Sequence, residues 1–306
     1  MIDTCPFTIP EPETVNTMPG LLYFIWEREA IRIARENGHP APWTRDPVLG
    51  KYKFTNIRRR DDRVSKWIAE HIIKPNEHRK DLWFILLITR LINWPPTLRF
   101  LIDEGILFRS ADDFESKKFS AALEQCKSLG AKVYSGAYMV YPTKMDPGGV
   151  KSLAIAQHII APALSLKNEI NLELFSGTPL ISKFVETLSR GFGISTFMAG
   201  QVAADLTYAN EGQLSRASDL YTYAPIGPGS SRGLNYLLNR APNAGWAQDS
   251  FNAELIKIRN MVIDNLQIDD LTLHDVQNCM CEFSKYCRTV IGDGVPKTTY
   301  KPEMEF

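Results

Sequence analysis

The chain has 306 residues, of which 44% are hydrophobic and 23% charged, and its formal net charge is +0. These values are ordinary for a globular protein with one large domain or two smaller ones. Bulk charge therefore does not point to a nucleic-acid partner, and such a role would need locally clustered charge. The five cysteines are odd in number and unevenly spaced, which disfavours a disulfide framework and favours a reducing compartment.

Neither targeting nor membrane signals stand out. The N-terminal residues show no basic start followed by an apolar run, so no signal peptide is expected and the predicted location is cytoplasmic. The most apolar stretch, residues 82–92, is too short to span a bilayer and contains Arg90. It predicts a buried core helix, and no membrane partner is expected.

The overall pattern is helical. Residues 1–18 are rich in Pro, Thr and Glu and predict a flexible N-terminal arm. Helical periodicities follow one another from there, without a repeat, a low-complexity tract or a linker. The sequence therefore predicts a mainly α fold that forms a single compact unit over residues 19–306.

Basic residues lie on one face of the first predicted helix, residues 21–37. Arg28, Arg32 and Arg35 are spaced i, i+4 and i+7, which places them on the same side. This stripe is either a solvated basic face or a ridge that faces phosphates.

An arginine run follows, with Arg58, Arg59, Arg60 and Arg63 around the start of the next predicted helix. Between residues 28 and 63, ten Lys and Arg stand against five Asp and Glu, a local charge of +5. Pairing with the neighbouring aspartates explains part of this run but not the excess. Such a concentration is expected where an anionic polymer or a pyrophosphate docks.

Aromatic residues mark the only stretch with extended character, residues 131–141. Tyr134, Tyr138 and Tyr141 either line a cleft or pack, and packing is expected for at least two of them.

A predicted helix ending at Arg190 leads into the turn Gly-Phe-Gly-Ile, and a second helix starts at Ser195 or Thr196. Gly191 and Gly193 allow positive φ and close backbone approach, and Ser or Thr suits an N-cap. The amides at the start of the second helix would form an anion site for a DNA phosphate. An ordinary pair of core helices with a glycine connector explains the pattern equally well.

A single Asp219 and a second glycine-rich turn, residues 227–232, follow this hairpin. Hairpin, helix, loop, aspartate and helix is an order of parts that resembles the helix-hairpin-helix DNA glycosylases. In the second hairpin helix, Gln201 and Asp205 share one face, and a structural hydrogen bond is favoured for Asp205.

The last predicted helix, residues 272–291, carries Cys279, Cys281 and Cys287. Cys279 and Cys281 point to different helix faces and fit no zinc or iron–sulfur spacing, so buried thiols and no metal are predicted. The chain also lacks a P-loop, a dinucleotide-binding glycine motif, a zinc-protease motif and a deaminase motif.

Six blocks in order carry a wider resemblance: WEREAIRIARENGHPAPWTRDPVLGKYKFTNIRRRDDRVSKWI, DLWFILLITRLINWP, VYSGAYMV, GISTFMAGQVAADL, GPGSSRGLN and DVQNCMCEFSKY. Over residues 21–300 the chain resembles the helical family of bacteriophage thymine-hypermodification enzymes. That family includes the helical domain of 5-hydroxymethyluracil DNA kinases and the α-glutamyl/putrescinyl thymine pyrophosphorylases, which are amino acid:DNA transferases. Because no P-loop is present, the stand-alone transferase type is favoured.

The resemblance implies a transferase that displaces pyrophosphate from pyrophosphorylated 5-hydroxymethyluracil in double-stranded DNA with an amino acid or a polyamine. It further implies a helix-hairpin-helix, DNA-glycosylase-like fold that flips the base. The host cytoplasm is the expected location if the chain is phage-encoded, and a monomer is expected. No cofactor is expected to be required, and a divalent or monovalent cation at the hairpin is compatible with the pattern.

The resemblance also suggests roles for particular residues. Asp219 is the candidate general base or an anchor for the substrate ammonium, and Glu27 is the second candidate carboxylate. DNA or pyrophosphate binding is assigned to Arg28, Arg32, Arg58, Arg59, Arg60, Arg63, Gly191, Gly193, Ser195, Thr196, Gly227, Gly229, Ser230, Ser231 and Arg232. Supporting roles fall to Asp205, Gln201, Asn56 and Asn235.

Two other functions remain open for the same residues. One is a DNA glycosylase that removes a modified base and leaves an abasic site. The other is a non-catalytic module that binds modified DNA without changing it.

Overall fold

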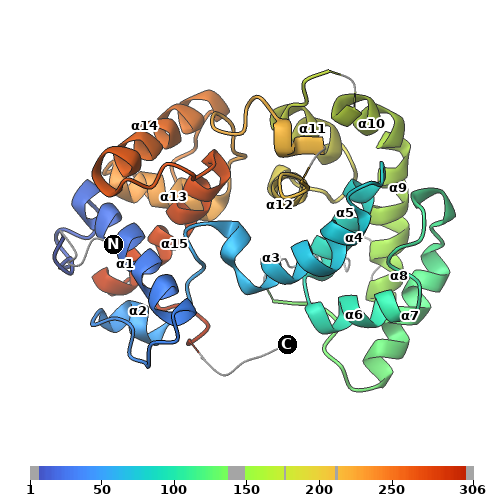
Figure 1. Cartoon of the computed structure of the whole chain (residues 1–306), viewed down its shortest axis with the longest axis horizontal. Coiled ribbons are helices and arrows are strands. Elements are labelled where there is room, and N and C mark those ends of the chain that lie inside the picture. Colours follow the sequence, from blue (N-terminus) through green and yellow to red (C-terminus); the bar gives the residue numbers. More distant parts are fainter. Residues whose placement is uncertain (1–6, 137–148, 176, 211–212, 301–306) are drawn as a thin grey trace. The chain divides into compact units, whose positions relative to one another are not determined.

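The computed structural model describes residues 7–136, 149–175, 177–210 and 213–300 (Figure 1). The predicted mainly α fold is confirmed: the regular elements in these ranges are helices, with one isolated antiparallel bridge between Tyr52 and Thr299. None of the described helices is both long and apolar enough to cross a membrane.

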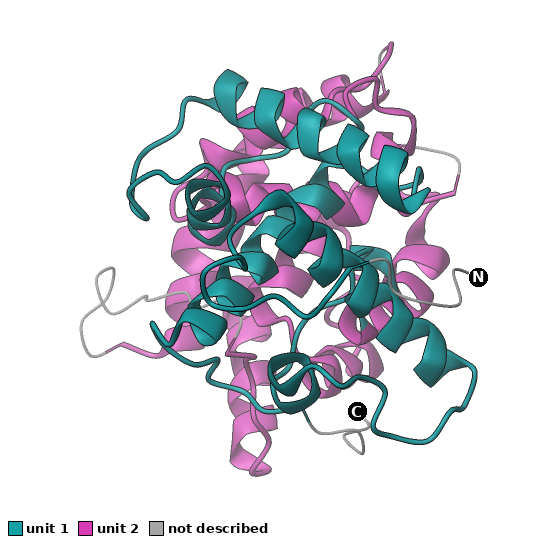
Figure 2. Cartoon of the chain, turned by 90° about the vertical axis from the view of Figure 1, so that its left-hand side faces the viewer, with its two compact units in different colours: residues 1–62, 221–305 teal, residues 63–220, 306 magenta. Residues whose placement is uncertain are grey.

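The chain groups into two compact units, and the single domain expected over residues 19–306 stays a prediction. Unit 1 consists of residues 1–62 and 221–305, and unit 2 of residues 63–220 with residue 306 (Figure 2). The chain passes between the units at residues 62–63, inside the arginine run, and at residues 220–221. The first crossing lies in a highly polar stretch, residues 58–63, and the second precedes a Pro- and Gly-rich stretch, residues 225–229, which are compositions that often mark a domain boundary.

Unit 1 is built around its last helix. Its elements are α1 (Met18–Glu36), α2 (Pro47–Lys51), η1 (Arg59–Asp61), α13 (Pro228–Leu237), α14 (Gln248–Leu266) and α15 (Leu273–Ile291). Thr272 and Asp275 form a reciprocal capping box at the start of α15, and Gly292 ends the helix at φ 86°. Apolar residues from α1, α14 and α15 form one core cluster.

Two glycines let α13 approach α15 closely. A Cβ atom at Gly229 would lie 2.3 Å from Cys281 Sγ, and one at Gly233 would lie 2.1 Å from the Met280 carbonyl oxygen. Both distances are too short for any side chain. The glycines four residues apart on α13 therefore serve helix packing.

The predicted flexible arm differs from the structure over its described part. Val15 is fully buried and belongs to the core cluster of unit 1. Thr17 caps α1 by accepting a hydrogen bond from the amide of Gly20. Val15 lies two residues before this cap and packs into the core, so the end of the arm is anchored.

Unit 2 contains the remaining helices. They are α3 (Arg63–Ile68), η2 (Ala69–Ile73), α4 (Lys74–Asn76), α5 (Leu82–Ile92), α6 (Pro95–Asp103), η3 (Ala111–Asp113), α7 (Ser116–Ser128), α8 (Lys151–Ile155), η5 (Ala156–Ile160), α9 (Ala161–Ala163), η6 (Leu164–Leu166), α10 (Lys167–Phe175), α11 (Ile181–Ser189), α12 (Thr196–Leu206) and η7 (Gln213–Arg216). The prediction that residues 82–92 form a buried core helix is confirmed, because every residue of α5 is buried.

A buried ion pair joins α5 to α12. Arg90 donates from Nε and Nη2 to the two carboxylate oxygens of Asp205 at 2.6 and 2.5 Å, and both side chains are almost fully buried. Arg90 also donates to Asn93 Oδ1 at 3.0 Å and to Ser65 Oγ at 3.4 Å. Asn93 in turn donates to Ser135 Oγ at 3.3 Å. The favoured structural role of Asp205 is confirmed.

Replacing Asp205 with Asn should destabilise unit 2 strongly, because it leaves the Arg90 charge buried without a counter-charge. Removing one member of a buried ion pair typically costs about 3–5 kcal/mol. The measurement is urea-induced unfolding followed by circular dichroism.

The matched control is Lys118→Gln, which removes an exposed lysine that pairs with Glu115 on the surface. It should unfold close to the wild type. A double variant, Arg90→Met with Asp205→Leu, should recover much of the loss, because no charge remains buried. Equal stability of Asp205→Asn and the wild type would show that the pair is not needed.

Candidate functional site

A glycine turn joins α11 to α12 at residues 191–194, and its assignment as a helix-hairpin-helix DNA-binding motif stays a prediction. Gly193 has φ 74°, a conformation that glycine adopts readily, and the Ser195 hydroxyl accepts from the amide of Met198 at 3.2 Å. Ser195 and Thr196 are exposed, and Phe192 at the turn is 61% exposed. The turn and the first amides of α12 are therefore accessible to a ligand.

Asp219 caps the start of α11, the helix that precedes this turn. Its Oδ1 accepts from the amide of Ile181 at 2.7 Å and its Oδ2 from the amide of Ser182 at 2.9 Å. These amides open α11 and have no partner within the helix. The carboxylate is 9% exposed, so Asp219 acts as a cap supplied from 37 and 38 residues further along the chain. Its catalytic role remains a prediction.

Ion pairs neutralise much of the arginine run in unit 1. Arg58 donates to both oxygens of Asp270 at 2.7–3.0 Å and to Glu29 at 2.7 Å. Arg60 shares Asp270 at 2.7 Å. These partners, with the desolvation of Arg58 opposing them, raise the pKa of Arg58 and hold its charge in place. Arg32 pairs in the same manner with Glu29, Glu36 and Asp61.

Arg28 and Arg59 are buried, and the predicted binding of DNA or pyrophosphate by these residues stays a prediction. Arg28 donates to the carbonyls of Thr55 and Phe54 and to Asn56 Oδ1, at 3.2–3.4 Å. The Arg59 amide donates to Asp275 at 2.8 Å. Arg63 is exposed at the start of unit 2.

Part of the excess positive charge is thus offset by acids from far along the chain. Asp270 pairs with Arg58 across 212 residues, and Glu282 on α15 attracts the buried guanidinium of Arg28. The sequence count, which stopped at residue 63, could not include these acids.

The second glycine-rich turn also has structural contacts. The Gly227 amide donates to Ser230 Oγ at 3.2 Å, and that hydroxyl also accepts from Gln277 at 3.2 Å. Because Gly229 also packs against α15, most of the contacts of this turn are made within the protein. Ser231 and Arg232 are partly exposed, and among the described residues Arg232 has no carboxylate partner. Its guanidinium is the accessible cation of this turn.

Asn235 and Gln201 are buried. The Asn235 amide donates to the carbonyls of Pro242 and Ala244, and its oxygen accepts from Trp246 Nε1 at 2.9 Å. Asn235 therefore holds the segment between α13 and α14, which gives it a structural role.

Burial raises the pKa of three described carboxyls in unit 1, those of Glu27, Asp62 and Asp275. Burial raises the pKa of Glu27, whose oxygen accepts a hydrogen bond from the Thr44 hydroxyl. Burial, aided by the negative charge of Glu282, raises the pKa of Asp62 to about 7, against the effects of the Asn56 amide and Arg59. Such carboxyls are candidates for proton transfer. Asp62 was missed in the sequence because its position beside three arginines suggested an ordinary ion pair.

The candidate residues fall into two groups. The hairpin, Asp219, Asp205, Gln201 and Arg63 belong to unit 2, and the other candidates belong to unit 1. Among the residues with described positions, no group of three or more His, Cys, Asp or Glu side chains is arranged to hold a metal. Cys126, Cys279 and Cys287 are free and buried, whereas Cys281 is partly buried.

Asp62 should make stability depend on pH. Its folded pKa of about 7 exceeds its ordinary value of 3.8, so folding favours the protonated carboxyl. Wild-type stability should therefore fall as pH rises from about 4 to about 7 and then level off. Asp62→Asn removes this titration while keeping an acceptor for the Asn56 amide.

The measurement is the free energy of unfolding of both proteins across this pH range in matched buffers. The variant should gain stability relative to the wild type as pH rises. A difference that stays constant would contradict the raised pKa.

Comparison with known proteins places these features in a family. A family model described as the helical domain of 5-hmdU DNA kinase matches residues 16–294. The 5-hmdU DNA kinase of Bacillus phage SP10 is 25% identical over 299 residues, covering 90% of this chain and 46% of the relative. The chain thus spans about half the length of that relative. No solved structure matches it. Because the family model covers most of the chain, the protein belongs to the family of the 5-hmdU DNA kinase helical domain.

Proposed function

We propose that this protein takes part in hypermodification of thymine in phage DNA, as a transferase that joins an amine to the 5-methylene of pyrophosphorylated 5-hydroxymethyluracil. Family membership supports 5-hydroxymethyluracil as the nucleobase that is modified, because the relative is named for 5-hmdU in DNA. The accessible hairpin between α11 and α12 supports contact with a DNA backbone, because exposed amides at a helix start bind phosphate. Family membership is the observation that carries the proposal.

The proposed step is a substitution at the methylene carbon. The nitrogen of a neutral amine forms a bond to this carbon while the carbon–oxygen bond to pyrophosphate breaks. The amine proton passes to a base, and pyrophosphate leaves with the electron pair of the broken bond. Cations near the leaving oxygens would stabilise the developing charge, and Arg232 is the accessible guanidinium in the second glycine turn.

Asp219 is the proposed base or ammonium anchor. Two amides occupy one acceptor position on each of its oxygens, and an ionised carboxylate has about four such positions in total. The remaining positions are available to a substrate amine. In this proposal the same carboxylate fixes α11 and faces the amine.

The test is nucleoside mass spectrometry. Duplex DNA carrying pyrophosphorylated 5-hydroxymethyluracil is incubated with the protein and a panel of amino acids and diamines, and then digested. A nucleoside in which one amine has replaced pyrophosphate is expected. Abasic sites would instead identify a glycosylase, and bound but unchanged DNA would identify a binding module.

Asp219→Asn should abolish turnover while DNA affinity stays within a few fold. It should also weaken the cap of α11, at a cost of about 1 kcal/mol. Thr272→Ala is the matched control, because it removes a cap of similar worth from α15 and should keep turnover. Retained activity in Asp219→Asn would remove Asp219 from the mechanism.

A further inference from the structure

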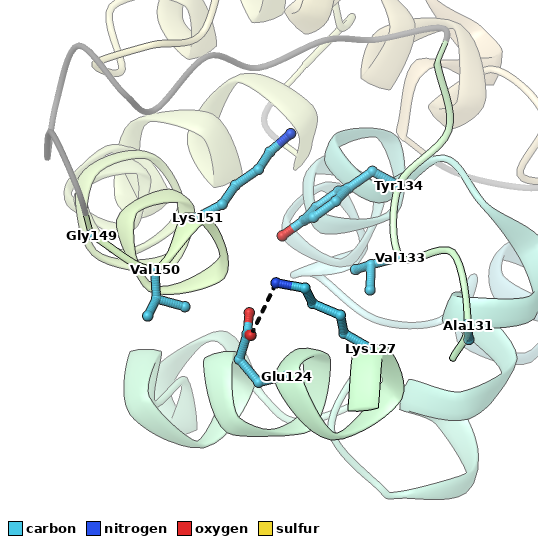
Figure 3. A pocket seen from close by; sticks show the side chains of 8 residues that line it. All are labelled: Glu124, Lys127, Ala131, Val133, Tyr134, Gly149, Val150 and Lys151. Atoms are coloured by element: carbon cyan, nitrogen blue, oxygen red, sulfur yellow. Dashed lines mark ion pairs between the residues drawn. The ribbon is translucent and has the colours of Figure 1, made fainter. Parts of the chain in front are cut away.

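A cavity of about 600 Å³ lies in unit 2, apart from every residue assigned to the proposed reaction. Figure 3 shows it between the C-terminal half of α7, the chain that follows α7, and the start of α8. The residues that line it are Glu124, Lys127, Ala131, Val133, Tyr134, Gly149, Val150 and Lys151. Its volume falls within the usual range for a site that holds a small molecule, roughly 300–1,000 Å³.

Among the described lining residues, the charged groups are two ammonium groups and one carboxylate. The carboxylate of Glu124 already accepts from Ser152 Oγ at 2.8 Å and lies 3.7 Å from the Lys127 ammonium. Lys151 has no carboxylate partner among the described residues, and its ammonium lies 4.4 Å from the centre of the Tyr134 ring. The lining therefore carries one unbalanced positive charge.

A phenol completes the set of polar groups. The Tyr134 hydroxyl is buried and has no hydrogen-bond partner within the described part of the chain. It points into the cavity toward the side where Lys127 lies (Figure 3). Burial and the charge of Glu124 raise the pKa of Tyr134, so the phenol keeps its proton and remains a donor. A buried hydroxyl without a partner is destabilising, and a hydrogen-bond acceptor on a ligand would offset this cost.

We propose that this cavity binds a small phosphate-type oxyanion, with Lys127 and Lys151 as the cations and the Tyr134 hydroxyl as a donor. Two ammonium groups act as point charges, so they attract a phosphate, which can place two negative charges on one group, more strongly than a carboxylate, which places one. The apolar side chains of Val133 and Val150 leave room for an organic body attached to the phosphate. The proposal does not depend on the reaction proposed above.

The test is calorimetric titration of the full chain with four probes: inorganic phosphate, pyrophosphate, ribose 5-phosphate and glutarate. Phosphate-bearing probes should bind, and glutarate should bind much more weakly. Tighter binding of ribose 5-phosphate than of inorganic phosphate would identify an organic phosphate ester as the ligand. Tighter binding of the inorganic probes would identify free phosphate or pyrophosphate.

Substitutions of the two lysines and of Glu124 should change the affinity for phosphate in opposite directions. Lys127→Gln and Lys151→Gln should each weaken binding about tenfold, equivalent to 1.4 kcal/mol, and Tyr134→Phe should weaken it roughly threefold. Glu124→Gln should strengthen binding, because it removes the negative charge that competes for Lys127. Lys118→Gln, on α7 outside the cavity, is the matched control and should leave affinity unchanged.

Absence of phosphate binding at millimolar concentration would overturn the proposal. So would binding that survives both lysine substitutions, or glutarate binding equal to that of phosphate. Weaker binding in Glu124→Gln would also overturn it, because that sign is expected for a cationic ligand. Circular dichroism of each variant separates a lost site from a lost fold.

Discussion

The ion pair between Arg90 and Asp205 is the constraint on which the arrangement of unit 2 depends. Transferring the two charges from water is costly, and only close hydrogen bonds in one geometry can offset that cost. Arg90 meets this condition through Asp205, Asn93 and Ser65 together. Asp205 lies on α12. The position of this helix is therefore set by its buried contact with Arg90 as well as by the glycine turn before it. The hairpin is thus presented by a rigid support.

In unit 1, the same organising role belongs to α15. Its first turn is capped by Thr272 and receives the amide of Arg59, and its middle accepts the two glycines of α13. Glu282 accepts from the amide of Thr55 at 2.9 Å. The segment before the arginine run is therefore fixed by acidic side chains of a helix that lies more than 200 residues away in sequence. This explains how a strongly basic stretch folds in a protein without net charge.

Local patterns predicted the local structure well. Apolar periodicity predicted α5, and the glycine turn followed by Ser195 predicted the start of α12. Both predictions were possible because helix periodicity and helix caps depend on residues that are close in sequence. Partners distant in sequence were not predictable. The sequence around Arg58 and Asp270 does not indicate that they pair. The sequence around Asp219 likewise does not indicate that it caps α11. Of the three tyrosines weighed as cleft or core residues, Tyr134 lines a cavity, and Tyr138 and Tyr141 lie outside the described residues.

The two units also differ in how their chains are arranged, which bears on synthesis. Unit 2 is one continuous segment, whereas unit 1 combines residues 1–62 with residues 221–305. A ribosome completes every helix of unit 2 before it makes α13, α14 or α15. Domains generally fold as units during synthesis, so unit 2 has all of its contacts first. The apolar face of α1 is synthesised first and stays uncovered until α14 and α15 are made. In the nascent chain it is therefore a surface at which chaperone binding or aggregation is expected.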